Sequence, residues 1–307
     1  MITQGYVDTV RLMLRAAPLV FEHPGLALKG GTAINLYIDH MRRLSVDLDV
    51  VYLDGAADRD AALNDIARIL TALSERAINQ GLGVQRLHRS DDAEAVLIIS
   101  DGSVRVKIEV NTVFRGSVYR PLSMDLCATA ARTFEVSAPV TLLDTSEVYA
   151  GKFLAALDRQ HPRDLFDLWR FRQTSAIDDR LMDAFTLYLS GHDRPPHEIL
   201  DGRDRDMSRD YERGLLGMLE EPIPSLEELQ ETRDWARGAV IASLNGAQRG
   251  FLADFFSLRD IRDQFAGARL AHLPALEWKR RNLRIFRDTR PGEFARQLDA
   301  LNRVLEQ

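Results

Sequence analysis

The sequence predicts an α/β (α+β) protein with a mixed sheet, followed by an all-helical C-terminal half. Segments with helical periodicity alternate with segments rich in β-branched residues up to about residue 143. The pair Asp101-Gly102 separates two of the β-branched segments, which is typical of a hairpin. Strand signals stop after Ser175. We therefore expect two domains, residues 1–143 and residues 144–307.

Length and composition indicate a globular protein. The chain has 307 residues, a hydrophobic fraction of 45% and a formal net charge of -6. Its single cysteine, Cys127, excludes an internal disulfide and a cysteine-based zinc site. We find neither an apolar run of about eighteen residues nor a signal-peptide pattern, so we expect a cytoplasmic protein with no membrane partner.

The first elements surround a pair of glycines. Residues 6–22 have helical periodicity and end at His23-Pro24-Gly25, and residues 26–28 form a short strand. Gly30-Gly31 then makes a turn, and a helix is expected from Thr32 to about Arg42. The positive end of this helix would face the turn, an arrangement that favours anions.

The remaining elements follow from the same patterns. We expect helices at residues 58–78, 148–159 and 162–172, and helices throughout the chain after Ser175. The expected strands are residues 46–53, 83–88, 93–100 and 103–113, with a short strand at 134–137 in an otherwise irregular stretch.

Two aspartates lie inside the apolar strand at residues 46–53. Because side chains alternate along a strand, Asp47 and Asp49 must point to the same face. Two like charges held side by side are usually compensated by a cation, so this pair is a metal-site hypothesis. Glu109, on the polar face of the strand at 103–113, is a candidate third carboxylate, and its alternative is an ordinary surface residue.

The glycine turn is a weak signal by itself, but its combination with Asp47 and Asp49 is stronger. The turn and the helix terminus can hold a triphosphate while the aspartates hold a divalent metal against it. Lys152 and Asp167 each lie among apolar residues, so each charge needs a partner. An ordinary salt bridge between two helices is the alternative for this pair. Asp164 is expected to pair with Arg163 or to cap a helix.

Several motifs between residues 26 and 170 carry a family resemblance. They are Lys29-Gly30-Gly31-Thr32-Ala33 with Leu36, Arg43-x-Ser45-x-Asp47-x-Asp49, Lys107-x-Glu109, Glu147 to Phe153 with Ala156 and Arg159, and Arg163 to Leu168. Together they resemble the DNA polymerase beta-like nucleotidyltransferase superfamily, and within it the AbiEii/AbiGii-type toxins, which include the MenT-like proteins. Threonine stands at position 32, where the superfamily has serine, and keeps the hydroxyl.

This resemblance implies a role for each matching position. Gly31 and Thr32 would contact the β- and γ-phosphates, and Asp47 and Asp49 would bind two Mg²⁺ ions. Lys152 would neutralise the triphosphate, with Asp167 beside it. The nucleotide-binding set is Lys29, Gly30, Gly31, Thr32, Arg43 and Ser45, and the metal ligands are Asp47, Asp49 and Glu109. Arg43 either binds nucleotide phosphate or orients Asp47.

The expected function is Mg²⁺-dependent transfer of a nucleoside monophosphate from an NTP to an acceptor. By resemblance the acceptor is the 3′ end of tRNA, and a cognate antitoxin is a partner. One alternative is nucleotidylation of a protein or of a small molecule such as an aminoglycoside, and another is a nucleotide-binding regulator without turnover. The basic run at residues 279–290 is either a solvated helix face or a surface that grips an RNA backbone.

Overall fold

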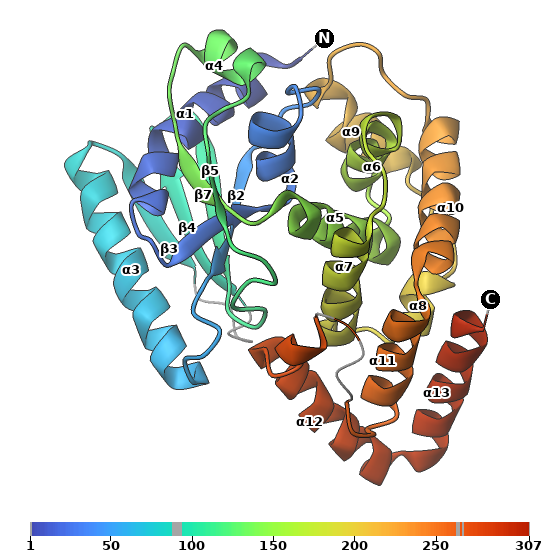
Figure 1. The fold of residues 1–307 in the computed structure, drawn as a ribbon. Coiled ribbons are helices and arrows are strands. Elements are labelled where there is room, and N and C mark those ends of the chain that lie inside the picture. The colour runs from blue at the N-terminus through green and yellow to red at the C-terminus, as the bar shows by residue number, and fades with distance from the viewer. Residues whose placement is uncertain (1, 88–93, 262–264, 266, 307) are drawn as a thin grey trace. The chain divides into compact units, whose positions relative to one another are not determined.

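A mixed sheet is the centre of the N-terminal part of the chain in the computed structural model, which describes residues 2–87, 94–261, 265 and 267–306 (Figure 1). Within these residues the sheet has seven strands in the order β3-β4-β5-β2-β1-β7-β6. The strands are β1 (Leu26–Lys29), β2 (Asp47–Tyr52), β3 (Gly83–Leu87), β4 (Glu94–Ser100), β5 (Arg105–Asn111), β6 (Leu122–Met124) and β7 (Val140–Leu142). β2 runs parallel to β5 and antiparallel to β1, so the predicted mixed sheet is confirmed.

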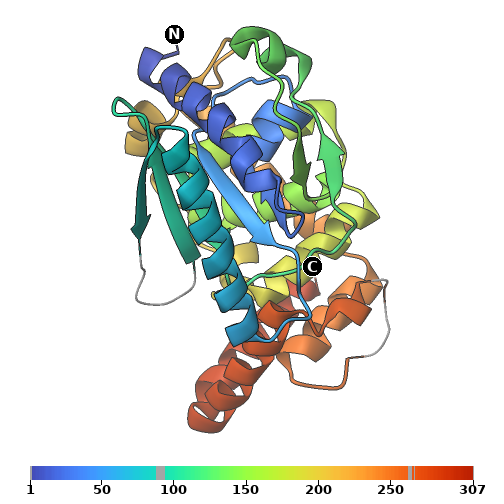
Figure 2. The same cartoon turned by 90° about the vertical axis from the view of Figure 1, so that its left-hand side faces the viewer.

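Two long helices cover one face of this sheet. α1 (Gln4–Phe21) contacts β1, β2, β5 and β7, and α3 (Arg59–Asn79) contacts β3 and β4 (Figure 2). Asp58 caps α3 by accepting a hydrogen bond from the backbone N–H of Ala61 at 2.8 Å. The two helices predicted at these positions are thus confirmed.

The chain forms two compact units by its internal contacts. Unit 1 contains the residues up to Val148 together with Arg213–Ile223, and unit 2 contains Tyr149–Glu212 and the residues from Pro224 onward. The domain boundary expected at residue 143 stays a prediction. Unit 1 is therefore discontinuous in sequence, because an eleven-residue segment of the later chain returns to it.

The helix expected from Thr32 to Arg42 is shorter than predicted. It consists of α2 (Gly30–Thr32) and a π-helical turn, η1 (Ala33–Ile38). Beyond it, Leu44 donates a backbone hydrogen bond to Met218 at 2.8 Å, and Arg43 forms an isolated bridge with Leu219. The helix ends early because these residues pair with a distant segment of unit 1 instead of with their own neighbours.

Two further local predictions differ from the structure. The strand expected at 134–137 is absent, since α4 (Ala128–Phe134) occupies its start and Glu135 has a left-handed φ of 52°. The loop between β4 and β5 has four residues instead of two, because Ser100 pairs with Arg105. The Asp101 carboxylate accepts hydrogen bonds from the backbone N–H groups of Ser103 and Val104, which stabilises this longer turn. The expected strand ends at His88 and Ala93 lie outside the described residues.

The rest of the described chain is helical, as predicted. The remaining helices are α5 (Thr145–Arg159), α6 (Pro162–Thr174), α7 (Asp179–Gly191), α8 (Pro196–Leu200), α9 (Ser208–Gly214), η2 (Leu216–Met218), α10 (Leu226–Ser243), α11 (Gly246–Phe256), η3 (Ala268–Leu270), α12 (Pro274–Thr289) and α13 (Pro291–Leu305). Phe153 of α5 is fully buried in unit 2, against the rings of Phe171 at 5.3 Å and Trp235 at 5.9 Å. None of the helices in the described ranges is both long and apolar enough to cross a membrane.

Candidate active site

The two aspartates of β2 lie on one face of the strand, as the alternation predicts. Leu48 and Val50 are buried, whereas Asp47 and Asp49 are half-buried. In the register with β5, Asp47 is opposite Lys107 and Asp49 is opposite Glu109. On the other side of β2, Lys29 of β1 is opposite Asp49. Residues opposite each other in neighbouring strands share a face of the sheet, so three carboxylates and two ammonium groups gather there.

Because Lys29 of β1 lies opposite Asp49 on the other side of β2, Lys107 is one of two lysines in register with this acidic group. Its ammonium forms an ion pair with Glu109, on the next outward position of the same strand. Partial burial acts to lower the pKa of Lys107, but the hydrogen bond and charge of Glu109, together with the charges of Asp47 and Asp49, outweigh it and raise the pKa. Lys107 thus stays protonated and partly neutralises the carboxylates.

The glycine turn packs directly against the aspartates. Gly30 has a φ of +74°, and a Cβ at this position would lie 2.3 Å from Oδ2 of Asp49. The hydroxyl of Thr32, a residue that is only 1% exposed, donates a hydrogen bond to the backbone carbonyl of Asp47 at 2.5 Å. The turn therefore fixes the backbone of one aspartate and leaves room for the carboxylate of the other. Contact of Thr32 with phosphate stays a prediction.

We expect that Gly30→Ala lowers activity while Gly81→Ala does not. Gly81 is the matched control, because it has a similar φ of +77° but no atom within 4 Å of the place where a Cβ would lie. Both variants should lose about 1 kcal/mol of unfolding free energy through left-handed backbone strain. Only Gly30→Ala should also displace Asp49, at a cost of roughly 10²-fold in rate. Chemical denaturation and initial rates measure the two effects, and equal activity of the two variants would contradict the assignment.

Arg43 and Ser45 lie beside the second glycine. A Cβ on Gly31 would be 2.6 Å from Nη2 of Arg43 and 3.0 Å from Oγ of Ser45. Arg43 is 2% exposed and donates a hydrogen bond from Nη1 to the carbonyl of Leu44 at 2.9 Å. The structure therefore brings Lys29, Gly30, Gly31, Thr32, Arg43, Ser45, Asp47, Asp49 and Glu109 together in unit 1.

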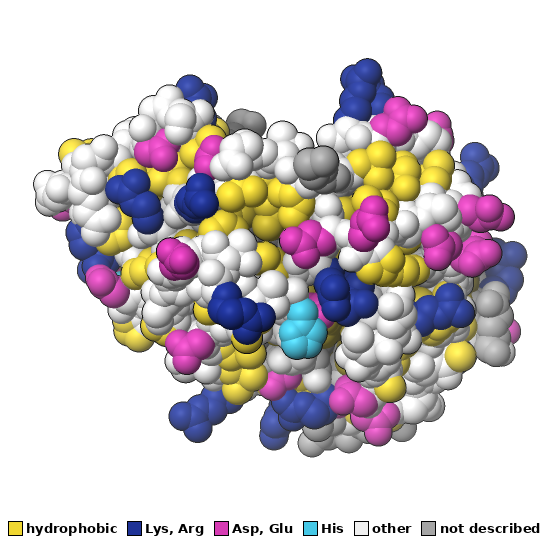
Figure 3. Space-filling view, turned by 90° about the horizontal axis from the view of Figure 1, so that it is seen from above, with side chains coloured by type: hydrophobic (Ala, Val, Ile, Leu, Met, Phe, Trp, Pro, Cys, Tyr) yellow, Lys and Arg dark blue, Asp and Glu magenta, His cyan; other side chains and the backbone are white. Residues whose placement is uncertain are grey.

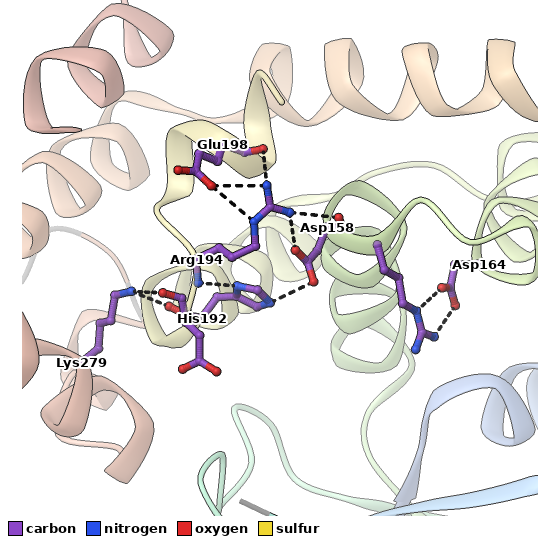
Figure 4. Close-up of polar contacts among 8 residues, drawn as sticks. Asp158, Asp164, His192, Arg194, Glu198 and Lys279 are labelled. Atoms are coloured by element: carbon purple, nitrogen blue, oxygen red, sulfur yellow. Dashed lines mark hydrogen bonds and ion pairs between the residues drawn. The ribbon is translucent and has the colours of Figure 1, made fainter. Parts of the chain in front are cut away.

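A second charged cluster is buried in unit 2. The ammonium of Lys152 lies 2.7 Å from Oδ1 of Asp164 and 3.0 Å from Oδ2 of Asp167. Arg159 donates two hydrogen bonds to Asp164, from Nε at 2.5 Å and from Nη2 at 2.9 Å (Figure 4). Lys152 is 4% exposed and both aspartates are 1% exposed. The sequence placed Lys152 beside Asp167, and the structure adds Asp164 to the pair.

The prediction that Asp164 pairs with Arg163 is wrong. Asp164 pairs with Lys152 and Arg159 instead of Arg163, and His161 caps α6 by accepting a hydrogen bond from the backbone N–H of Arg163 at 3.1 Å. The spacing contains the missing signal, because residues three apart on a helix share a face. If Asp167 faces Lys152, Asp164 must face the same way.

The electrostatics of the second cluster favour a charged Asp164. Burial acts to raise the pKa of Asp164, but the charges and hydrogen bonds of Lys152 and Arg159 outweigh it and hold the pKa well below its usual range. Lys152 thus has a negative partner without any ligand. The role of Lys152 toward a triphosphate stays a prediction.

The donor atoms of the aspartates are those that a magnesium ion needs. Hard divalent cations prefer carboxylate oxygens, and the half-buried Asp47 and Asp49 supply them from adjacent outward positions of one strand. Among the residues that the structure describes, no three His, Cys, Asp or Glu side chains are arranged as a metal cluster. Asp47 and Asp49 therefore fit the role of metal ligands by donor type, whereas the carboxylate of Glu109 already has Lys107 as a partner.

Known proteins share both the sequence pattern and the fold. Residues 11–239 match the family model described as nucleotidyl transferase AbiEii toxin of a type IV toxin–antitoxin system. No curated protein matches the chain. Among solved structures, the chain is similar to MenT4, a nucleotidyltransferase toxin of Mycobacterium tuberculosis H37Rv, with a TM-score of 0.62 and 16% identity over 90% of this chain and 93% of that one. The structural match supports the fold, and the family model covers both charged clusters.

Proposed function

Because this chain belongs to the AbiEii family of nucleotidyltransferase toxins of type IV toxin–antitoxin systems, we propose that it uses magnesium to transfer a nucleoside monophosphate from an NTP to the 3′ end of tRNA. The observation that carries the reaction type is the Asp47 and Asp49 pair, held against the turn at Gly30 and Thr32. Family membership already implies an NTP substrate and an antitoxin partner. The metal, the tRNA acceptor and a cytoplasmic location are parts of the proposal.

In this reaction an acceptor hydroxyl oxygen forms a bond to the α-phosphorus of the NTP. The bond from that phosphorus to the oxygen bridging the β-phosphate breaks, pyrophosphate leaves, and the acceptor proton is lost to solvent or to a carboxylate. Asp47 and Asp49 would hold magnesium, which when bound neutralises phosphate charge and lowers the pKa of the acceptor hydroxyl. Gly30, Gly31 and Thr32 would shape the phosphate site.

The second cluster supplies positive charge in this proposal. Lys152 would neutralise the triphosphate, and Asp167 would position the ammonium by the contact at 3.0 Å. Asp164 would serve the same positioning role, since it contacts Lys152 at 2.7 Å and is itself held by Arg159. The support for one shared reaction is that the family model spans both clusters.

The basic run at residues 279–290 has two kinds of members. Lys279 donates hydrogen bonds to the backbone carbonyls of His192 and Asp193 at 2.7 and 2.9 Å, so it has a structural partner (Figure 4). Arg281 and Arg284, by contrast, are exposed on α12, and Arg281 lies about one helical turn after Trp278, which is 47% exposed. An exposed aromatic ring among arginines suits contact with RNA, which supports an RNA acceptor.

The test is incubation of the purified protein with each α-labelled NTP, Mg²⁺ and total tRNA. We expect label in tRNA, its loss in Asp49→Ala, and its loss on addition of EDTA with recovery on excess Mg²⁺. Label in protein or in a small molecule would refute the tRNA acceptor and keep the enzyme class. NTP binding without any label would instead favour a regulator that has no turnover.

A further inference from the structure

Unit 2 contains a groove of about 790 Å³ that none of the roles above uses. It is lined by residues that follow α7, by α8 and the loop after it, and by one face of α13. Four of its lining residues have side chains suited to an anionic ligand, and these are His197, Arg203, Arg205 and Arg303. All four lie within unit 2, so the groove is a property of that unit alone.

The groove has an excess of positive charge that its own acids do not neutralise. Asp204 accepts hydrogen bonds from Arg233 at 2.9 Å and from Arg237 at 3.0 Å, so its charge is compensated by two arginines that do not line the groove. Glu198 likewise pairs with Arg194 (Figure 4). Within the described part of the chain, Arg203, Arg205 and Arg303 form no ion pair. The third lining acid, Asp201, has no ion pair among the described residues, so three guanidinium groups stand against one uncompensated carboxylate.

This excess is local. Acidic and basic side chains are interspersed on the face drawn in Figure 3, in agreement with the net charge of -6 for the whole chain. A polyanion would thus not be attracted by the overall charge of the protein. It would need a local group of arginines such as the one in the groove.

The loop that carries Arg203 and Arg205 has a fixed backbone. The side chain of Gln160, which is 4% exposed, donates to the carbonyl of Arg203 at 2.9 Å and accepts from the N–H of Arg205 at 2.8 Å. Gly202 passes so close to α8 that a Cβ would lie 2.1 Å from the carbonyl oxygen of Glu198. Both guanidinium groups therefore extend from a positioned loop, which reduces the entropy lost when they bind a ligand.

His197 supplies an independent observation. Its Nδ1 is buried and has no hydrogen-bond partner among the described residues, although the side chain lines the groove. Burial lowers the pKa of His197, and the neighbouring Arg303 lowers it further against the opposing effect of Glu198. A neutral imidazole offers both a donor and an acceptor.

We propose that this groove binds successive phosphate groups of a polynucleotide backbone. Guanidinium groups bind phosphate oxygens in a bidentate manner, and several of them along an open groove suit a chain of phosphates better than one ion. Among the described residues that line the groove there is no Phe, Tyr or Trp, so contacts to the phosphate backbone should outweigh stacking on bases. This proposal rests on the proposed function in one respect: the polynucleotide is identified as the RNA acceptor.

The test measures binding of fluorescein-labelled tRNA to the full-length protein by anisotropy over a series of salt concentrations. Arg203→Gln/Arg205→Gln should weaken binding about tenfold or more at low salt and reduce the slope of log Kd against log salt by about 1 to 2. Arg303→Gln, on a different element, should weaken binding about threefold. The matched control is Arg105→Gln/Arg132→Gln, which removes the same charge from two exposed positions of unit 1 and should bind as the wild type does.

Three outcomes would refute the groove proposal. In the first, both groove variants keep the wild-type tRNA affinity and salt slope. In the second, the groove and control variants lose tRNA affinity equally, and in the third, the groove variants lose NTP affinity and not tRNA affinity. The transfer assay tests the tRNA acceptor separately from the groove proposal. If the wild-type protein labels tRNA but the groove variants bind tRNA as well as the wild type does, the groove proposal is refuted and the acceptor proposal stands. If the groove variants selectively lose tRNA binding but the wild-type protein transfers no label to tRNA, the groove proposal is supported and the acceptor proposal is refuted.

Discussion

Asp47→Asn should lower the rate of nucleotide transfer by about 10³-fold or more, because the neutral amide cannot supply the charge that a divalent metal requires. The fold should be retained. Thr32 bonds to the backbone carbonyl of Asp47 and not to its side chain, so the substitution keeps that contact. Initial rates of incorporation from α-labelled NTP measure the first effect, and thermal unfolding measures the second.

The control for this substitution is Asp60→Asn, which removes one exposed carboxylate from the first turn of α3 in the same unit. Its transfer rate should equal that of the wild type. An Asp47→Asn protein that is folded and retains more than about a third of the wild-type rate would refute the role of this aspartate.

Lys152→Met should reduce the free energy of unfolding by about 3–5 kcal/mol, because it leaves the buried carboxylates of Asp164 and Asp167 without their ammonium partner. Arg159→Gln is the matched control, since it removes a cation from the same Asp164. Its side chain is 59% exposed, so its loss should cost only about 1 kcal/mol. Urea denaturation of the three proteins measures the difference, and similar losses in both variants would contradict the importance of burial.

The same cluster predicts a pH dependence. The folded state holds the pKa of Asp164 below the value of about 3.9 that is usual for an unfolded aspartate. The resulting stability is fully present above that unfolded value and is lost as the pH falls through the lower, folded pKa. We expect wild-type stability to decrease with acidification below about pH 4, and Lys152→Met to show a shallower decrease. Equal slopes for the two proteins would show that Lys152 does not hold this pKa down.

Local patterns predicted most of the secondary structure. The alternation of Val106, Ile108 and Val110 with polar residues identified β5, and the burial of these three side chains confirms it. The helix expected to reach Arg42 was wrong for a physical reason. The residues that follow its actual end pair with Met218 and Leu219, and no local propensity encodes a partner so distant in sequence.

The candidate site, too, could be predicted from the sequence only in part. A period of two was sufficient to place Asp47 and Asp49 on one face. Alignment of this pair with Lys107 and Glu109 depends on the parallel pairing of β2 with β5, which the sequence does not specify. Thr32 was expected to contact phosphate, and its hydrogen bond to Asp47 could not be anticipated because it depends on how closely the turn approaches the strand.

The return of residues 213–223 to unit 1 has a consequence for biosynthesis. Met218 and Leu219 supply the backbone partners of Leu44 and Arg43, beside the glycine turn. A chain emerging from the ribosome folds from its N-terminus, so the whole sheet leaves the exit tunnel before these partners are made. The loop that carries Arg43 therefore acquires its native pairing only after α5 to α9 have been translated.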